Sequence, residues 1–253
     1  MAVKKEATID VVQITRDTLT AYVVGRTPLI CNAMNQKIRQ DLLFPPGKKN
    51  AAEKASTLKH EPVAEFRRSC YKSVGDDQPT RILLPATAFK SAIRSAALDM
   101  PGAAKSQIGR LLYVEGEYIS IYGTPEVFMR VTRSADMNRT PDVRTRAILR
   151  EWACRLELTF ITPLLKAKTV GTLLAASGIM RGVGDFRVEK GAGNYGCFDT
   201  VPASSKSYAR IVKAGGRKAQ DAALLKAASY DSETEELLTW FNAEVLRRGM
   251  KVA

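Results

Sequence analysis

The glycine-rich run at residues 180–196 limits what this chain can form, because glycine lets a backbone approach a ligand more closely than any other residue does. Five glycines alternate there with cations and aromatic rings. The cations are Arg181, Arg187 and Lys190, and the rings are Phe186 and Tyr195. Cations that contact phosphates and rings that stack on bases are what sequence-tolerant binding of a single nucleic-acid strand requires. The composition of the run suits a phosphodiester chain better than a small metabolite.

A second informative segment, residues 84–96, reads as a strand end, a turn at Pro85 and a helix. Lys90 and Arg94 are four residues apart, so they lie on the same face of that helix. They are candidate phosphate ligands, although cations on a helix face are also found simply exposed to solvent.

The charge of the chain indicates an anionic partner. The formal net charge is +13 and the sequence pI is about 9.7. An excess of this size attracts polyanions over a long range, and nucleic acid is the expected partner. The alternatives are a solubilising surface without a specific partner, or an acidic membrane, for which the chain lacks a basic amphipathic anchor helix.

Cysteine spacing and hydropathy favour a soluble cytoplasmic protein. The four cysteines are Cys31, Cys70, Cys154 and Cys197; they form no CxxC pair, which argues against a zinc ribbon or a disulfide scaffold. The first twenty residues are too charged for a signal peptide, and no window resembles a membrane span. No cofactor is expected, because Lys190-Gly191 reverses the order of a Walker loop and no dinucleotide fingerprint follows a strand.

Hydrophobic periodicity predicts an α+β fold with a modified ferredoxin-like or RNA-recognition arrangement and an antiparallel sheet. We expect strands or hairpins at the start, middle and end of the chain, with two strands paired around Glu115-Gly116-Glu117. Helices are expected at 86–98 and at 170–178, where Gly178 would end the second helix. The predicted strands are 7–24, 81–84, 111–114, 118–122, 127–132, 152–159 and 196–201.

Residues 1–203 are predicted to form one domain with basic insertions at about 44–80 and 130–150. We expect the first insertion to be mobile and exposed, with a helix near 62–74. The second is expected to be a projecting hairpin or finger, rich in arginine, the residue best suited to bidentate phosphate contacts. Asp136 and Asp142 could pair with two of its arginines.

The remaining residues, 204–253, are predicted to be a basic linker and a C-terminal amphipathic helix. The linker would cover 204–218 as loop. The helix would span 232–248, with Ser232 and Glu235 as a capping box. Its apolar stripe would be Leu237, Leu238, Phe241, Val245 and Leu246.

The motifs resemble those of the repeat-associated mysterious proteins of CRISPR systems. Residues 84–94 resemble that superfamily's proline-containing strand-to-helix motif, residues 178–198 resemble its glycine-rich loop, and residues 25–30 resemble the end of its first strand. The chain is also similar to uncharacterised bacteriophage proteins that carry a Gly-Asp-aromatic-Arg-Pro-Glu-Lys signature, in which Val188 here replaces the proline. Asp185 and Glu189 make this loop more acidic than typical loops of the superfamily.

The resemblance implies a backbone subunit that polymerises along a guide RNA, grips its phosphates and splays its bases with a hairpin. On this basis and from the residue patterns, we expect a non-catalytic, single-stranded nucleic-acid-binding protein whose partners are RNA or DNA and copies of itself. The candidate binding residues are Arg26, Lys37, Lys90, Arg94, Arg133, Arg139, Arg144, Arg146, Arg181, Phe186, Arg187, Lys190 and Tyr195.

Two alternatives remain open from the sequence. Some members of the superfamily cut RNA with a histidine as general base, and His60 is the single histidine here, without a partner that the sequence identifies. A phage protein that imitates a CRISPR subunit and binds its protein partners would have the same basic surface. The choice between RNA and DNA and the stoichiometry are equally open.

Overall fold

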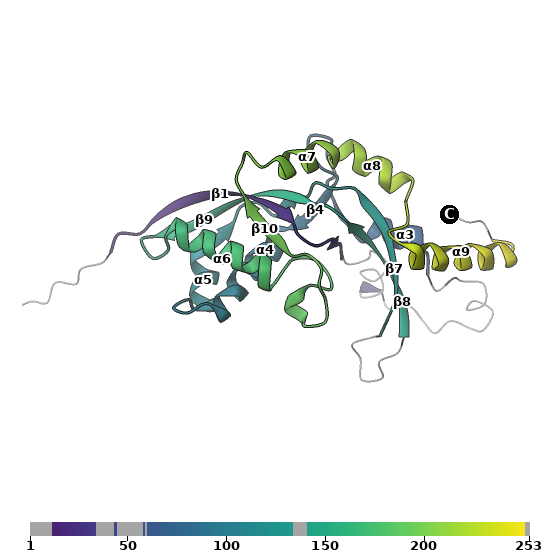
Figure 1. Ribbon diagram of the computed structural model, residues 1–253, viewed down its shortest axis with the longest axis horizontal. Coiled ribbons are helices and arrows are strands. Elements are labelled where there is room, and N and C mark those ends of the chain that lie inside the picture. Colours follow the sequence, from purple (N-terminus) through teal and green to yellow (C-terminus); the bar gives the residue numbers. More distant parts are fainter. Residues whose placement is uncertain (1–11, 34–42, 45–57, 59, 134–140, 251–253) are drawn as a thin grey trace, which may run out of the picture.

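The fold is taken from a computed structural model of the chain, which describes residues 12–33, 43–44, 58, 60–133 and 141–250. Within these residues the strands form three antiparallel sheets (Figure 1). Residues 45–57 and 59 of the predicted first insertion and residues 134–140 of the predicted finger lie outside the described residues.

The largest sheet has the strand order of a ferredoxin-like fold. Its four strands run β10-β1-β9-β5, and all neighbours are antiparallel. In chain order, β1, β5, β9 and β10 are the first to fourth strands of a βαββαβ unit, so the order across the sheet is 4-1-3-2. This order confirms the predicted fold class. The elements of the unit are β1 (Thr15–Gly25), α4 (Ala86–Ala96), β5 (Leu112–Val114), β9 (Ala153–Thr162), α6 (Ala167–Met180) and β10 (Phe198–Val201).

Helices α4 and α6 cover one face of this sheet, because alternate residues of its strands are apolar and point toward them. Leu156, Leu158 and Phe160 of β9 are fully or almost fully buried on that face. Phe89 and Ile93 of α4 are fully buried in the same hydrophobic core. The short elements η1 (Ala97–Asp99) and α5 (Lys105–Leu111) follow α4 and lead into β5.

Gly178 lies inside α6 and does not end it, which corrects the predicted boundary. A Cβ atom at this position would lie 2.1 Å from the carbonyl oxygen of Phe198 in β10. The glycine is therefore needed for close approach of helix and strand, and not for a left-handed turn.

Two smaller sheets extend the central one. The strands β2 (Leu29–Ile30), β8 (Pro141–Leu149) and β7 (Pro125–Arg133) form one of them, and β3 (Tyr71–Lys72), β4 (Ile82–Pro85) and β6 (Tyr118–Ser120) form the other. The prediction that β5 and β6 pair with each other is wrong. Strand β5 pairs with β9, whereas β6 pairs with β4.

In the described part of the first insertion, residues 62–73 pack on the core, whereas residues 74–79 are exposed. Helix α3 (Pro62–Arg68) confirms a helix near residue 62, but it ends at Arg68 and is followed by β3. Phe66 of α3 is fully buried. Ser69 Oγ accepts a hydrogen bond from the backbone N–H of Ala147 in β8 at 2.7 Å. The helix is thereby fixed to the hairpin strand β8.

The predicted loop at 204–218 is wrong, because two helices occupy most of it: α7 (Lys206–Ala214) and α8 (Arg217–Leu225). Gly215 and Gly216 separate them. A Cβ atom at Gly215 would lie 2.2 Å from the backbone nitrogen of Gly123, so this turn packs directly on the chain after β6. Four of the basic residues that suggested a linker are exposed on these two short helices, namely Lys206, Arg210, Lys213 and Lys218.

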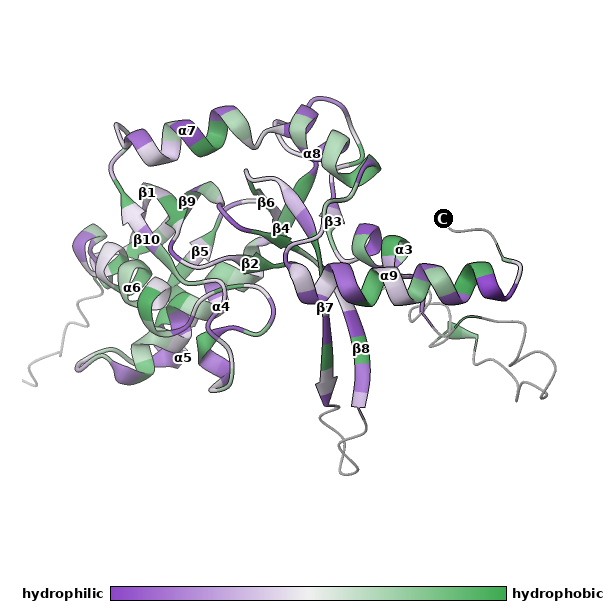
Figure 2. Cartoon of the chain, turned by 45° about the vertical axis from the view of Figure 1, so that its right-hand side comes forward, coloured by the Kyte–Doolittle hydropathy of each residue, from purple (hydrophilic) through white to green (hydrophobic). Residues whose placement is uncertain are grey.

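Helix α9 (Ser232–Arg247) confirms the predicted C-terminal helix, but its cap differs. Asp231 is the N-cap residue, and its side chain accepts a hydrogen bond from Thr234 N at 3.0 Å. In the predicted stripe, Val245 is buried, whereas Leu246 is 65% exposed. The helix packs against β7 (Figure 2), and its Leu237 and Leu238 lie against the hydrophobic core.

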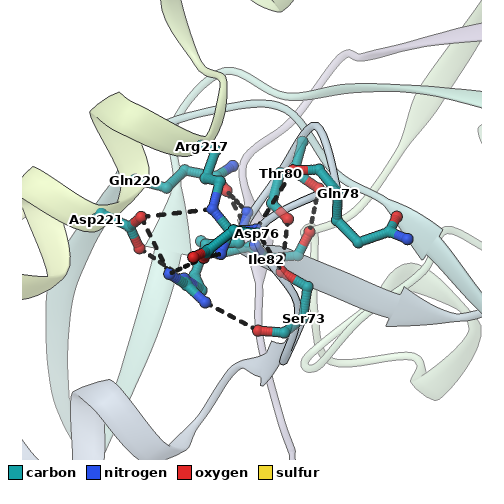
Figure 3. A network of polar contacts seen from close by, with 9 residues as sticks. Ser73, Asp76, Gln78, Thr80, Ile82, Arg217, Gln220 and Asp221 are labelled. Carbon is teal, nitrogen blue, oxygen red and sulfur yellow. Dashed lines mark hydrogen bonds and ion pairs between the residues drawn. The ribbon is translucent and has the colours of Figure 1, made fainter.

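A buried glutamine joins α8 to the smaller sheets (Figure 3). Gln220 is fully buried, and its Oε1 accepts hydrogen bonds from the backbone N–H groups of Arg81 and Ile82 at 2.7 and 2.9 Å. Its amide nitrogen is within 3.0 Å of three carbonyl oxygens, those of Ile121, Gly123 and Gly215. Every polar atom of this side chain is satisfied, as burial requires.

Around it, the guanidinium of Arg81 donates to both oxygens of Asp221 at 2.6 and 3.2 Å. Arg217 contacts Asp76 at 2.5 Å. The two ion pairs hold the turn between β3 and β4 against α8 (Figure 3).

All four cysteines are free and buried. Among the described residues, no helix combines the length and the apolar character needed to cross a membrane.

Candidate nucleic-acid interface

Strands β7 and β8 form a long hairpin that projects from the body of the protein (Figures 1 and 2). Its register pairs Phe128 with Arg146, Arg130 with Arg144, and Thr132 with Asp142. Because side chains alternate across a strand, these residues share one face of the hairpin. The predicted finger is therefore present, and its start lies at Pro125, ahead of the predicted arginine-rich segment.

The glycine-rich loop at residues 182–196 folds against β2. The backbone N–H of Asp185 donates to Ile30 O at 2.9 Å, and that of Gly196 donates to Pro28 O at 2.8 Å. Gly184 has φ +84°, and a Cβ there would lie 2.6 Å from Ile30 O. Only glycine permits this approach without strain.

Strand β2 brings the loop and the hairpin together. Leu29 and Ile30 pair with Leu149 and Ile148 of β8, while Ile30 also forms a bridge with Asp185. The two segments that the sequence identified separately thus lie on either side of one short strand. Between them is a groove of about 290 Å³, named the hairpin groove here. It is lined by Ile30, Phe128, Arg130, Val131, Thr132, Arg133, Arg144, Arg146, Asp185, Phe186 and Tyr195.

A row of aromatic rings runs along the hairpin groove. The ring of Phe186 lies 6.2 Å from that of Tyr195, Tyr195 lies 6.0 Å from Phe128, and Phe128 lies 5.6 Å from Tyr230. The outermost ring, Phe186, is 50% exposed and has φ +51°. A large residue rarely adopts this left-handed conformation, and here it holds an apolar ring in solvent at the mouth of the groove.

The cations of the groove fall into two classes. Arg130 is held by Asp231 and Glu233 of the α9 segment and lies over the Phe128 ring, 4.5 Å from its centroid. Arg133 and Arg144 are exposed, and in the described part of the chain neither has a carboxylate partner. The second class is available to a phosphate group.

Arg146 is the most buried cation of the groove. Burial lowers the pKa of its guanidinium, although Asp185 lies 3.8 Å away and acts in the opposite direction. Its Nη1 donates to Thr145 O at 3.0 Å, while its Nε is buried without a hydrogen-bond partner among the described residues. A desolvated guanidinium of this kind gains from contact with an anion.

Two predicted cations of the loop have structural roles. Arg181 forms an ion pair with Asp99 of η1, and Arg187 contacts Glu189 Oε2 at 2.8 Å. Arg187 also donates to Gly184 O at 3.1 Å. Glu189, one of the acidic residues that distinguish this loop, therefore stabilises the loop's own conformation through Arg187. Lys190, at the end of η2 (Val188–Lys190), is exposed.

Lys90 and Arg94 are not brought to the hairpin groove. Thr87, Ala88 and Ser91 of α4 line a cavity with the glycine-rich loop, whereas Lys90 lies over the Tyr113 ring of β5 at 4.7 Å. Arg94 lines a separate surface with Lys105, Gly109 and Arg110 of α5. Helix α4 thus turns its cations away from the loop.

The other predicted residues are more peripheral. Arg26 is exposed just after β1, where its backbone N–H donates to Cys197 O at 2.9 Å. Lys37 and Arg139 lie outside the described residues.

Phe128, Arg130 and Ile30 were not among the sequence candidates, although they line the groove. The sequence pattern could have identified Phe128 and Arg130, because they are alternate residues of the strand expected at 127–132 and therefore share one face of it. Their position depended on the register with β8, which the sequence does not give.

Polar side-chain pairs and helix α7 occupy part of the open face of the central sheet. In RNA-recognition folds this face carries exposed aromatic residues. Here Thr18 and Thr159 share a hydrogen bond of 3.2 Å, and Arg155 contacts Glu157 at 2.5 Å. The Tyr22 ring packs edge-on against Tyr208 of α7. Helix α7 therefore covers part of the face (Figure 1).

His60, for which the sequence identified no partner, has two. Its Nδ1 lies 3.2 Å from Glu65 Oε1, and its Nε2 lies 3.3 Å from Asp142 Oδ1. Both ring nitrogens are engaged, so neither points to a substrate. Among the described residues, no cluster of histidine, cysteine, aspartate and glutamate is arranged to hold a metal ion.

Comparisons with known proteins give a structural likeness of low similarity but no match in sequence. No protein-family model matches the chain. No curated protein sequence matches it either. Among solved structures, it is similar to a chain of the cryo-EM structure of the Type III-B Cmr-beta bound to cognate target RNA, with 12% identity and a TM-score of 0.30. The match covers 72% of this chain and 59% of that chain, so this protein spans less than two thirds of that chain's length.

Proposed function

We propose that this protein is a non-catalytic subunit that binds single-stranded nucleic acid in the hairpin groove. The observation that carries the proposal is the row of rings from Phe186 to Phe128 beside Arg133 and Arg144, two exposed cations without a carboxylate partner among the described residues. Stacking on rings contributes about 1–3 kcal/mol per base and works for every base. A duplex keeps its bases stacked inside and cannot use such rings, so the arrangement favours a single strand.

In the proposed mode of binding, the two walls of the groove contact different parts of the nucleic acid. Bases stack on Phe186 and Tyr195 of the loop, while phosphates contact Arg133 and Arg144 of the hairpin. Arg146, which is partly desolvated, supports a phosphate deeper in the groove. Several copies of this protein bound side by side along one nucleic-acid strand would form the polymer that the motif resemblance implies.

A role as a histidine nuclease receives no support from the geometry. A general base needs a free ring nitrogen within hydrogen-bond reach of the proton that it removes. In His60 both nitrogens face carboxylates. We therefore propose binding without cleavage.

The direct test is fluorescence anisotropy with labelled single-stranded RNA, single-stranded DNA and duplex DNA at two salt concentrations, with size-exclusion light scattering of the same mixtures. We expect salt-sensitive binding of a single strand and growth into larger assemblies. Binding to none of the three would contradict the proposal and would favour a protein partner for the basic surface.

A pair of double variants tests the location of the site. Arg133→Ala with Arg144→Ala removes two cations of the groove. Arg155→Ala with Arg210→Ala removes the same charge from positions paired with Glu157 and Glu151. We expect the first variant to weaken binding at least about tenfold and to lower the salt slope by about two, because each phosphate contact contributes close to one. Equal losses in both variants would show that only net charge matters.

A further inference from the structure

The single histidine of the chain lies between two carboxylates from different elements. Glu65 belongs to α3, which His60 precedes, and Asp142 belongs to the hairpin strand β8. The distances, 3.2 Å to Glu65 Oε1 and 3.3 Å to Asp142 Oδ1, are within reach of hydrogen bonds from both ring nitrogens.

The chemistry of these groups requires two protons on the ring. An ionised carboxylate only accepts hydrogen bonds, whereas a neutral imidazole has one N–H donor and one nitrogen that accepts. Both contacts can therefore be hydrogen bonds only when the imidazole is protonated on both nitrogens. A neutral ring would turn a lone pair toward one of the two carboxylates.

The contact joins a fixed element to the projecting part of the hairpin. Helix α3 is fixed by the buried ring of Phe66 and by Arg67, whose Nε donates to Leu224 O at 2.9 Å. Asp142 pairs with Thr132 near the outer end of the described hairpin. His60 therefore connects α3 to β8 further out than the bond between Ser69 and Ala147 does.

The charged groups around the ring come from three elements. Glu61, which caps α3, and Arg68 of α3 contact each other at 3.7 Å. Arg144 and Arg146 of β8 line the same cleft as His60. The hydroxyl-bearing Tyr71 of β3 also lines it. Arg144 lines both this cleft and the hairpin groove, so the histidine contact is adjacent to the cations that we assign to phosphate binding.

We propose that His60 is a proton-dependent positioning residue: its doubly protonated ring holds β8 against α3 and so makes binding in the hairpin groove tighter at acidic than at alkaline pH. The effect on binding rests on the proposed function, whereas the contact of His60 with α3 and β8 does not. Histidine is the side chain that ordinarily changes charge between about pH 5 and 8.

The contact is tested without nucleic acid, by hydrogen–deuterium exchange of peptides from α3 and β8 at pH 5.5 and pH 8.5, scaled to the intrinsic exchange rates. We expect protection of residues 141–146 to fall at least about threefold between the two pH values, as one charge-assisted bond is lost. In His60→Gln, whose amide does not titrate, protection should not change with pH. Equal pH dependence in both proteins, or none in the wild type, would overturn the proposal.

The effect on binding is tested by anisotropy with single-stranded RNA at the same two pH values and constant salt. We expect the affinity ratio between pH 5.5 and pH 8.5 to be about tenfold in the wild type and close to one in His60→Gln. Asp142→Asn should also reduce the ratio, because an amide can donate to a neutral ring nitrogen. A ratio that stays equal in all three proteins would refute a role for His60. Absence of binding to both single-stranded RNA and single-stranded DNA at both pH values would refute the proposed function, while the exchange experiment would still decide the contact.

Discussion

Arg130 and Arg144 lie directly opposite each other on β7 and β8, yet they have different environments. Arg130 contacts Asp231, reaches Glu233 at 3.3 Å and covers the Phe128 ring. Arg144 is exposed and, within the described residues, has no carboxylate partner. Like charges opposite each other destabilise a strand pair, and the two acidic residues of the α9 segment offset that repulsion on one side only. The hairpin thus contains one structural arginine and one that is available to a ligand.

Replacing these two arginines should separate stability from binding. Arg130→Ala should lower the free energy of unfolding by about 1–2 kcal/mol, because it removes charge-assisted hydrogen bonds and a ring contact. Arg144→Ala should change stability by less than about 0.5 kcal/mol, as exposed substitutions usually do. Urea denaturation gives the first quantity, and anisotropy with single-stranded RNA should show the larger loss for Arg144→Ala. The reverse order in denaturation would contradict the assigned roles.

The pairing of Asp231 with Arg130 makes the docking of α9 sensitive to acid. The hydrogen bond from Arg130 lowers the pKa of the Asp231 carboxyl to about 2. Because the folded value lies below the usual value for aspartate, about 3.9, this contribution is present above pH 4 and is lost as the pH falls toward 2. Asp231→Asn should therefore destabilise the protein at pH 7 but have little effect near pH 2. The difference in melting temperature between the two proteins, measured from pH 7 to pH 2, checks the trend; a constant difference would contradict it.

Two glycines of α6 should respond in opposite ways to alanine. At Gly171 a Cβ meets nothing within 4 Å, so Gly171→Ala should stabilise the protein by about 0.5–1 kcal/mol through helix propensity. At Gly178 the added Cβ would lie 2.1 Å from Phe198 O, so Gly178→Ala must separate α6 from β10 and should destabilise by about 2 kcal/mol or more. Chemical denaturation of both variants measures the contrast. Stabilisation by Gly178→Ala would show that helix and strand are not in close contact.

The exposed ring of Phe186 should matter for binding more than for folding. Phe186→Ala should weaken binding of single-stranded RNA about tenfold, within the range for loss of one stacked base. Its melting temperature should hardly change, since the ring is 50% exposed. Trp240→Ala is the matched control, because Trp240 is an exposed ring on α9 outside the groove, with 61% exposure. A similar loss of affinity in both variants would indicate non-specific contact with rings.

The order of the βαββαβ elements could be predicted from the sequence because each element has its own periodicity. Residues 152–159 alternate between apolar and polar, and residues 86–96 carry apolar residues at helical spacing. Helices α7 and α8 were missed because each is only two to three turns long and a pair of glycines separates them. Short basic helices of this kind owe their stability to packing against the sheets, which a local pattern does not report.

The candidate site was predicted in part. The spacing of Lys90 and Arg94 correctly placed both on one face of α4, but it gave no information on which neighbour that face meets, and it meets α5 and β5. Arg181 and Arg187 had the right chemistry, but Asp99 and Glu189 hold them in ion pairs. Whether a cation is available to a ligand depends on contacts between residues that only the folded chain brings together.

What the sequence determined by itself is the local character of the chain: an α+β order of elements, a basic surface, a finger rich in arginine and a loop in which glycine permits close approach. What the tertiary structure decided is which of these meet. Ile30, Asp185 and Ile148 are far apart in the chain, and their adjacency depends on the pairing of β2 with β8 and on the bridge from β2 to the loop. A strand's register and a helix's packing direction follow from the burial of apolar surface across the whole fold. For that reason the groove between hairpin and loop, and the histidine between α3 and β8, arise only when the whole chain is folded.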